Sequence, residues 1–292
     1  MEIIGKVVAM NTSDGMENLS VLDQEGEAYN LKTSLDSVFQ IGHIYIFEVK
    51  KNIGERISYI VESYQAVMDL SLKESDAILR KFYPDASYSL EEAQKFIYEI
   101  LDKIDNKIIY DITKGLLTTY EKKFFIYPAA SKMHHTYVGG LAYHTIGMLK
   151  LADTFLKNYS YLNKDYLYAG IILHDLGKTK ELTGIEATEY TLDGQLLGHL
   201  VMGALEIGKI AESLGYGNTP EVRSLEHMLI SHHGQPQFGA AKRPMTPEAV
   251  ALWYIDTIDS KFRVLGEELG KTESNHFTDT IGVLDKVKIY KE

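Results

Sequence analysis

One ten-residue stretch, from Ala169 to Lys178, constrains this chain more than any other. Its first five residues are apolar or glycine and predict the buried side of a helix, and His174 and Asp175 follow them directly. Buried polar groups cost free energy unless they are satisfied, so folding alone has no use for His-Asp-x-Gly-Lys at the end of a core helix. A divalent metal ion satisfies both side chains at once, because imidazole nitrogen and carboxylate oxygen are common metal ligands. The stretch therefore predicts a metal centre.

The composition is that of a globular chain with room for two domains. Of 292 residues, 45% are hydrophobic and 24% are charged. The longest apolar runs fall well short of the roughly 20 residues of a membrane span, and the first six residues lack the basic and apolar regions of a signal peptide. We therefore expect a cytoplasmic protein without a membrane partner. The chain has no cysteine, so histidine and carboxylate side chains would have to hold any metal.

The net charge of −11 argues against a protein that coats nucleic acid with a broad basic surface. It does not exclude a nuclease, because bound divalent cations can supply the local positive charge that phosphate requires.

The first 66 residues read as β-structure. Five short β-prone runs, at 7–10, 19–22, 27–31, 44–49 and 57–61, are separated by turn sequences. This pattern predicts a small Greek-key barrel of the OB type, a fold that commonly binds single strands. The segment carries ten acidic and five basic side chains, which is a poor electrostatic groove for a strand. Its aromatic residues would stack on bases or, as we favour for most of them, fill the barrel; they are Tyr29, Tyr45, Phe47, Tyr59 and Tyr64.

The rest of the chain reads as helical, so the fold class is α+β and multidomain. We expect a helical connector over 67–124, packed on an all-α catalytic domain over 125–292. Apolar spacing and capping residues predict helices at 71–82, 89–104, 141–159, 166–178, from 194 onward, 221–233 and 246–269. Residues 271–292 carry weak signals and no prediction.

Histidines and acids gather at the ends of these predicted helices. A single half-buried histidine is more often a structural residue than a ligand. A whole ordered set around His-Asp-x-Gly-Lys is typical of a metal centre instead, and it consists of His144, His174, Asp175, His199, His232, His233 and Asp256.

The order of this set resembles the signature of the HD-domain metal-dependent phosphohydrolases. The sequence is more closely similar to the YhaM-type 3′→5′ exoribonucleases in five motifs: 133–135 (Met-His-His), 139–145 (Gly-Gly-Leu-Ala-Tyr-His-Thr), 172–178 (Ile-Leu-His-Asp-Leu-Gly-Lys), 197–199 (Leu-Gly-His) and 231–234 (Ser-His-His-Gly). That resemblance implies an N-terminal OB-fold joined to a C-terminal HD domain, and it favours manganese as the metal.

Two ions about 3.5–4 Å apart would suit such a ligand set. Asp175, with two oxygens, would bridge them and is the central catalytic residue. His144, His174 and Asp256 would complete the shell of the first ion; His199 and His232, with His233 as a further candidate, would complete that of the second. A metal-activated hydroxide would attack the phosphodiester. Iron, cobalt or nickel also suits these mixed ligands.

Further residues have expected roles around this centre. Lys178 would place its cation on a phosphate oxygen, the alternative being a charge that offsets a helix dipole. Asp259 would orient a ligand histidine. His134 and His135 would contact substrate phosphate or merely pack in their loop. Lys242 and Arg243, near Phe238, would form a substrate rim or an ordinary solvated loop.

Three functions remain open on the sequence. The leading hypothesis is a 3′→5′ exonuclease that acts on single-stranded RNA, and on DNA as a further substrate. The alternative is a phosphohydrolase of a free nucleotide or cyclic dinucleotide, with the barrel as a docking module. The third is a binding protein with little catalysis, which the complete ligand set argues against. Self-association is an open expectation.

Overall fold

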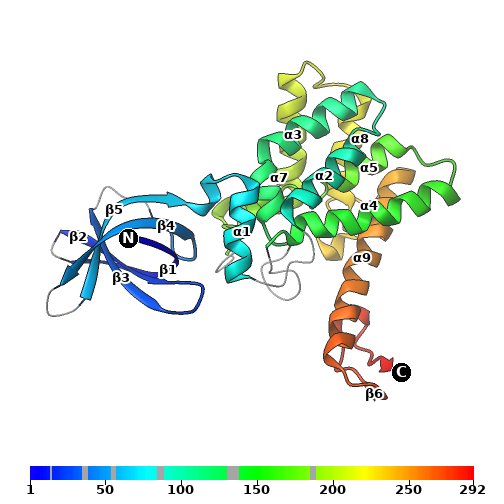
Figure 1. The fold of residues 1–292 in the computed structure, drawn as a ribbon. Helices are drawn as coiled ribbons and strands as arrows, with labels where there is room; N and C mark the ends of the chain where they lie inside the picture. Colours follow the sequence, from blue (N-terminus) through cyan, green and yellow to red (C-terminus); the bar gives the residue numbers. More distant parts are fainter. Residues whose placement is uncertain (14, 35–38, 54–56, 84–88, 130–137, 185–188) are drawn as a thin grey trace.

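The computed structural model describes residues 1–13, 15–34, 39–53, 57–83, 89–129, 138–184 and 189–292. A β-barrel lies at one end, a body of helices at the other, and a helical arm projects from the body (Figure 1). His134 and His135 fall outside the described residues.

The barrel is closed and has the strand order β1-β2-β3-β5-β4. Neighbouring strands are antiparallel except β3 and β5, which pair in parallel through Leu31 and Lys32. The OB-like barrel predicted from the sequence is thus confirmed, although the strands extend beyond their β-prone runs because pairing continues through polar ends such as Asn11 with Asn18. The strands are β1 Glu2–Ser13, β2 Met16–Leu22, β3 Ala28–Ser34, β4 Ile44–Ile53 and β5 Ile57–Ala66.

Aromatic residues of the barrel divide between its interior and its surface. Tyr45 and Phe47 are buried with Phe39 in the barrel core, as expected of inward-facing strand positions. Tyr64 is 42% exposed and lies over Phe39, with ring centroids 4.5 Å apart. Tyr29, with its partner ring Tyr59 at 5.9 Å, is only partly buried. The barrel therefore keeps a few accessible rings.

Nine α-helices are described in the remaining chain. Two of them begin with capping boxes, in which Ser71 pairs with Glu74 and Ser89 with Glu92. The expected helix over 166–178 is wrong at its end: α5 stops at Leu173, and a tight turn leads into the separate helix α6. The helices are α1 Leu72–Phe82, α2 Leu90–Leu101, α3 Lys107–Ile126, α4 Gly140–Asn158, α5 Lys164–Leu173, α6 Lys178–Glu181, α7 Leu192–Ser213, α8 Pro220–Ser231 and α9 Pro247–Lys271.

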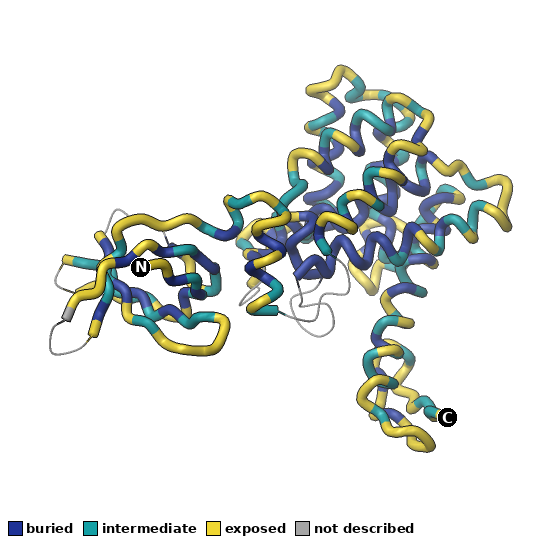
Figure 2. Tube along the Cα trace, in the orientation of Figure 1, coloured by how far each residue is buried: buried dark blue, intermediate teal, exposed yellow. Residues whose placement is uncertain are grey.

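Helix α5 is the centre of the helical body. It packs against α2, α3, α4, α8 and α9, and every residue from Leu167 to Leu173 is buried. This explains its nearly continuous apolar sequence, and Figure 2 shows the buried trace concentrated at this point. Helices α2 and α3 share the same hydrophobic core as the later helices. The proposed boundary between residues 124 and 125 falls within α3.

A second apolar cluster joins the barrel to the helices. The 3-10 helix η1, Val67–Asp69, follows β5 directly and places Val67 in one apolar cluster with Ile126 and Val138 of the helical body. Packed side chains, not an extended linker, therefore connect the two parts. We call this the junction cluster; its buried members are Ile44, Val67, Ile78, Leu79, Leu90, Ile126 and Val138.

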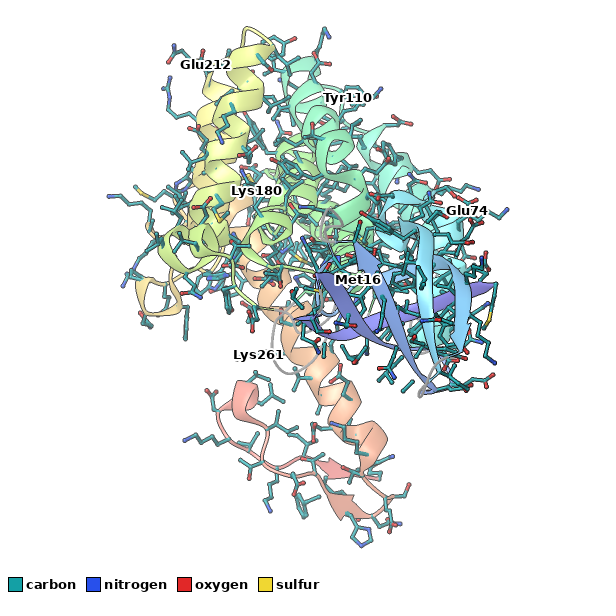
Figure 3. The ribbon with its side chains drawn as sticks, turned by 90° about the vertical axis from the view of Figure 1, so that its left-hand side faces the viewer. Met16, Glu74, Tyr110, Lys180, Glu212 and Lys261 are labelled. Carbon is teal, nitrogen blue, oxygen red and sulfur yellow. The ribbon has the colours of Figure 1, made fainter. Side chains whose placement is uncertain are left out.

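The outer half of α9 and the C-terminal tail form the arm. Both views show the arm standing away from the helical body, with Lys261 labelled in Figure 3. The tail folds back on itself through β6 His276–Phe277, the 3-10 helix η3 Gly282–Leu284 and β7 Tyr290–Lys291. Lys291 Nζ ties it to α9 by donating to the carbonyl oxygens of Leu269 and Thr272.

Candidate metal centre

The turn after α5 places Asp175 at the middle of a histidine cluster. His174 is the C-cap of α5, and Asp175, which is 3% exposed, follows it at the point where the buried helix ends. Asp175 Oδ1 lies 3.3 Å from His199 Nε2 and 3.7 Å from His232 Nε2, and Oδ2 lies 3.3 Å from His174 Nε2. One carboxylate therefore faces imidazoles from three helices.

The first group of potential ligands lies on one side of Asp175. His144 of α4, His174 and Asp256 of α9 place one ligand atom each within 4.8 Å of one another. His144 Nε2 is 3.1 Å from Asp256 Oδ1. This is the trio that the sequence assigns to the first ion.

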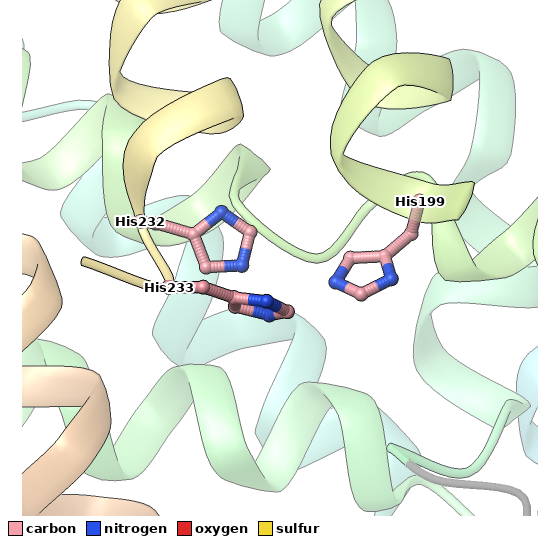
Figure 4. A group of neighbouring side chains, drawn as sticks. All are labelled: His199, His232 and His233. Atoms are coloured by element: carbon pink, nitrogen blue, oxygen red, sulfur yellow. The ribbon is translucent and has the colours of Figure 1, made fainter. Parts of the chain in front are cut away.

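The second group lies on the other side of Asp175 and consists of His199, His232 and His233. Figure 4 shows their rings facing one another, His199 from α7 and the other two from the end of α8. His232 is the C-cap of α8, so the helix ends where its ligand side chain begins. The group contains every residue assigned to the second ion, His233 included.

Each of these five imidazoles has its Nδ1 atom occupied by an oxygen acceptor. His174 and His232 use the same local device, a backbone carbonyl three residues earlier in the helix, at 2.8 and 2.7 Å. When Nδ1 carries the proton, the lone pair stays on Nε2, the atom that faces Asp175. The other three acceptors are Asp259 for His144, Glu181 for His199 and the Phe238 carbonyl for His233.

Four buried polar atoms at the centre lack a hydrogen-bond partner in the described structure. They are Nε2 of His174, His199 and His232, and Oδ1 of Asp175. Buried polar atoms without partners are rare, and a bound water or ion is what usually satisfies such atoms. Three imidazole nitrogens and a carboxylate oxygen are a ligand set for divalent transition metals, so the residues present fit a metal.

The pKa shifts agree with a cationic occupant. Burial alone would raise the pKa of Asp175, but Lys178 and His174 outweigh it and hold that pKa well below its usual range. Burial lowers the pKa of His232 well below its ordinary value, which keeps the imidazole neutral as metal binding requires. Burial opposes a charge on His144, but Asp256 and Asp259 raise its pKa to about 9. The negative charge of Asp256 and Asp259, which stabilises a proton on His144, would equally stabilise a bound metal cation.

Lys178 reaches the centre from the start of α6. Its Nζ donates to Asp175 Oδ2 at 2.6 Å and to the carbonyl oxygen of Ala129 at 2.7 Å. The alternative role of Lys178, a charge that offsets the dipole at the end of a long helix, does not fit the structure, because α5 ends at Leu173 and Lys178 begins the separate helix α6.

Two glycines shape the approach of α7 to this turn. Gly177 does not kink the chain, since its φ of −56° and ψ of −24° are ordinary helical values. Its hydrogen side chain is needed for space, since a Cβ there would lie 2.2 Å from the His199 carbonyl oxygen. Gly198 does use the left-handed region, with φ 72° and ψ 159°, and so breaks α7 immediately before His199.

Two further residues that the sequence predicts for the site lie apart from the buried cluster, and one residue of the site was not predicted. Lys242 and Arg243 are exposed in the segment after η2, Pro236–Phe238. The sequence reading overlooked Glu181, the buried acid that contacts His199. The only signal for it was an acid next to the apolar Leu182 and three residues after Lys178, in a segment with no clear period.

Comparison with known proteins gives this geometry its class. A family model described as the HD domain matches residues 141–261, which span the motif residues from His144 to Asp259. The fold and the histidine–aspartate cluster thus define the chain as an HD-domain protein.

Two relatives narrow the class. The 3′-5′ exoribonuclease YhaM of Geobacillus sp. (strain WCH70) is 42% identical over 238 residues, covering 79% of this chain and 73% of the relative. The protein of the same name from Bacillus licheniformis is 41% identical over 210 residues, covering 72% and 67%. The chain belongs to the YhaM family of 3′-5′ exoribonucleases. Within the described ranges, each helix is too short or too polar to cross a membrane.

Proposed function

We propose that this protein removes nucleotides from the 3′ end of single-stranded RNA by metal-dependent phosphodiester hydrolysis. Family membership supports the activity. The observation that carries it is the convergence of the unpartnered atoms of His174, His199 and His232 on Asp175.

We assign the ligand roles from the two groups. Asp175 would bridge two ions, since each of its oxygens faces a different neighbour set. His144, His174 and Asp256 would hold the first ion, and His199, His232 and His233 the second. When bound, such ions activate water and neutralise charge that develops on phosphoryl oxygens. Mixed imidazole and carboxylate ligands favour manganese, with iron, cobalt and nickel as further candidates, over magnesium or calcium.

Lys178 would act on the substrate directly. An ammonium group has three donors, and two are engaged with Asp175 and Ala129. The third remains for a non-bridging phosphoryl oxygen, where the positive charge would stabilise the transition state. The hydrogen bond from Lys178 to Asp175 would at the same time hold that carboxylate in place.

The strand would enter along the barrel side of the molecule. Tyr64 and the half-buried pair Tyr29 and Tyr59 offer rings on which bases could stack. Lys242, Arg243 and, outside the described residues, His134 and His135 would contact phosphates. Single-stranded DNA as a second substrate and self-association remain expectations of the same proposal.

A labelled-strand assay tests the function. Single-stranded RNA labelled at the 5′ end should give a ladder that shortens with time in manganese, whereas the same RNA labelled at the 3′ end should release labelled mononucleotide at once. Chelator and the Asp175→Ala variant should abolish both signals. Intact RNA with metal-loaded protein would contradict the proposal and favour a free nucleotide or cyclic dinucleotide as the substrate.

A further inference from the structure

The ligand His199 differs from its neighbours His232 and His233 in the acceptor of its Nδ1 hydrogen bond, which is a carboxylate and not a backbone carbonyl. We propose that Glu181 is the positioning residue for the second ion, which it controls through His199 and independently of the first ion. The inference rests on the two-ion arrangement of the proposed function.

Glu181 holds His199 at two points. Its Oε1 accepts hydrogen bonds from the His199 backbone N at 3.0 Å and from Nδ1 at 3.1 Å, and its Oε2 lies 3.0 Å from the same Nδ1. An ionised carboxylate only accepts hydrogen bonds, so it fixes the proton on Nδ1 and leaves the lone pair on Nε2. That Nε2 is the buried atom that faces Asp175 without a partner.

The backbone of α7 is broken so that this contact can form. Gly198 leaves the helical conformation, and His199 therefore starts the second segment of α7. Backbone N–H groups at the start of a helix need an outside acceptor, and an acidic side chain there also complements the helix dipole. Glu181 supplies both to His199, although it lies 18 residues earlier in the chain.

Glu181 itself is fixed in place. It is 7% exposed, and its carbonyl oxygen accepts from the Thr191 backbone N at 2.9 Å. A Cβ on Gly194 would lie 2.4 Å from that same oxygen, so α7 approaches Glu181 as closely as a glycine permits. Because Thr191 and Gly194 both pack against the backbone of Glu181, the carboxylate has little freedom to move.

Each ion would thus have one histidine that is supported by a carboxylate. For the first ion, His144 Nδ1 lies 2.8 Å from Asp259 Oδ2, and Arg263 Nε holds that oxygen at 2.6 Å. The other imidazoles of both groups rest on backbone carbonyls, which side-chain substitution cannot remove. Glu181 would therefore position a ligand of the second ion, and Asp259 a ligand of the first, independently of each other.

Equilibrium dialysis against manganese tests the assignment, with bound metal measured by elemental analysis and the spin-coupled manganese pair by electron paramagnetic resonance. The wild type should bind two ions. Glu181→Gln should weaken one ion by about 10–100-fold, leave the other unchanged and abolish the coupled signal. Glu181→Asp, which keeps the charge, should restore part of the loss. Asp259→Asn should weaken the other ion.

Glu206→Gln is the matched control, because Glu206 is a buried acid that binds Lys180 of the same helix α6 and touches no proposed ligand. It should bind both ions as the wild type does. Two ions of unchanged affinity in Glu181→Gln, or an equal loss of both ions, would overturn the role of Glu181. A wild type that binds a single ion would overturn the two-ion arrangement itself, whatever RNA cleavage shows.

Discussion

Lys178 Nζ and Asp175 Oδ2 lie 2.6 Å apart in the buried centre, a contact between residues three apart in sequence. The turn at 174–177 makes this possible, because it ends α5 and starts α6 within one loop of the chain. Burial would lower the pKa of Lys178, but Asp175 outweighs it and raises that pKa, so the ammonium stays charged.

Lys178→Met should lower the turnover rate on RNA by about 10²–10³-fold, the usual effect of losing one donor to a transition-state oxygen, and should leave bound metal unchanged. Single-turnover kinetics and metal analysis check both. Lys180→Met is the matched control, since Lys180 pairs with Glu206 and not with Asp175. Loss of metal from Lys178→Met would show that Lys178 chiefly holds Asp175.

Gly177→Ala should destabilise the protein by about 1–3 kcal/mol and reduce metal binding, because its Cβ would press on the backbone of His199. Gly266→Ala is the control: Gly266 lies in α9, and its added Cβ would meet open space. That change should stabilise the helix by about 0.5–1 kcal/mol. Denaturant titration compares the two. Equal effects of the two substitutions would contradict the steric role of Gly177.

The Glu206 network should make stability depend on acid pH. Burial would raise the pKa of Glu206, but hydrogen bonds from Lys180, Lys209 and Tyr120 lower it from 4.5 to about 2. A lowered carboxyl pKa stabilises the folded state above the unfolded value and loses that effect as the pH falls through the folded value.

Glu206→Gln should therefore cost about 1–2 kcal/mol at pH 7, a moderate figure because Lys209 is largely exposed to solvent. The cost should stay constant above about pH 5 and shrink between pH 4.5 and 2. Thermal unfolding of both proteins across this range measures it. A cost that is the same at pH 3 and pH 7 would rule out the linkage.

Ile126→Ala should destabilise the barrel and the helical body together. Ile126 is fully buried in the junction cluster, and such truncations cost about 2–5 kcal/mol. Trp253, the single tryptophan of the chain, reports on the helical body by fluorescence, and hydrogen exchange reports on the strands. Both signals should move to the same lower midpoint. A barrel that keeps its midpoint would show two independent units.

Local patterns explain what the sequence predicts well here. Short β-prone runs between turn sequences predict the barrel, and Ser89 and Thr246 predict the starts of α2 and α9 because capping is a local interaction. The grouping of His144 with Asp256 follows the ligand chemistry.

Other features depend on contacts between distant segments. Glu181 becomes significant only because α7 folds back over α6, and the need for Gly177 arises from the backbone of His199. Helix α5 likewise ends at Leu173, directly before the turn that carries His174 and Asp175 into the cluster. Such contacts have no local signature that one sequence can reveal.

The junction cluster has a consequence for how the length of a single-stranded RNA affects its degradation. Because Val67 and Ile126 belong to one apolar cluster, the barrel packs directly on the helical body that contains the metal centre. Under the proposed function, the distance between the barrel and the metal centre sets a minimum length of RNA that can contact both. RNA long enough to span it engages both parts, and a fragment trimmed below that length keeps contact with only one. Degradation should therefore slow abruptly at a defined fragment length, which the architecture sets and the base sequence does not.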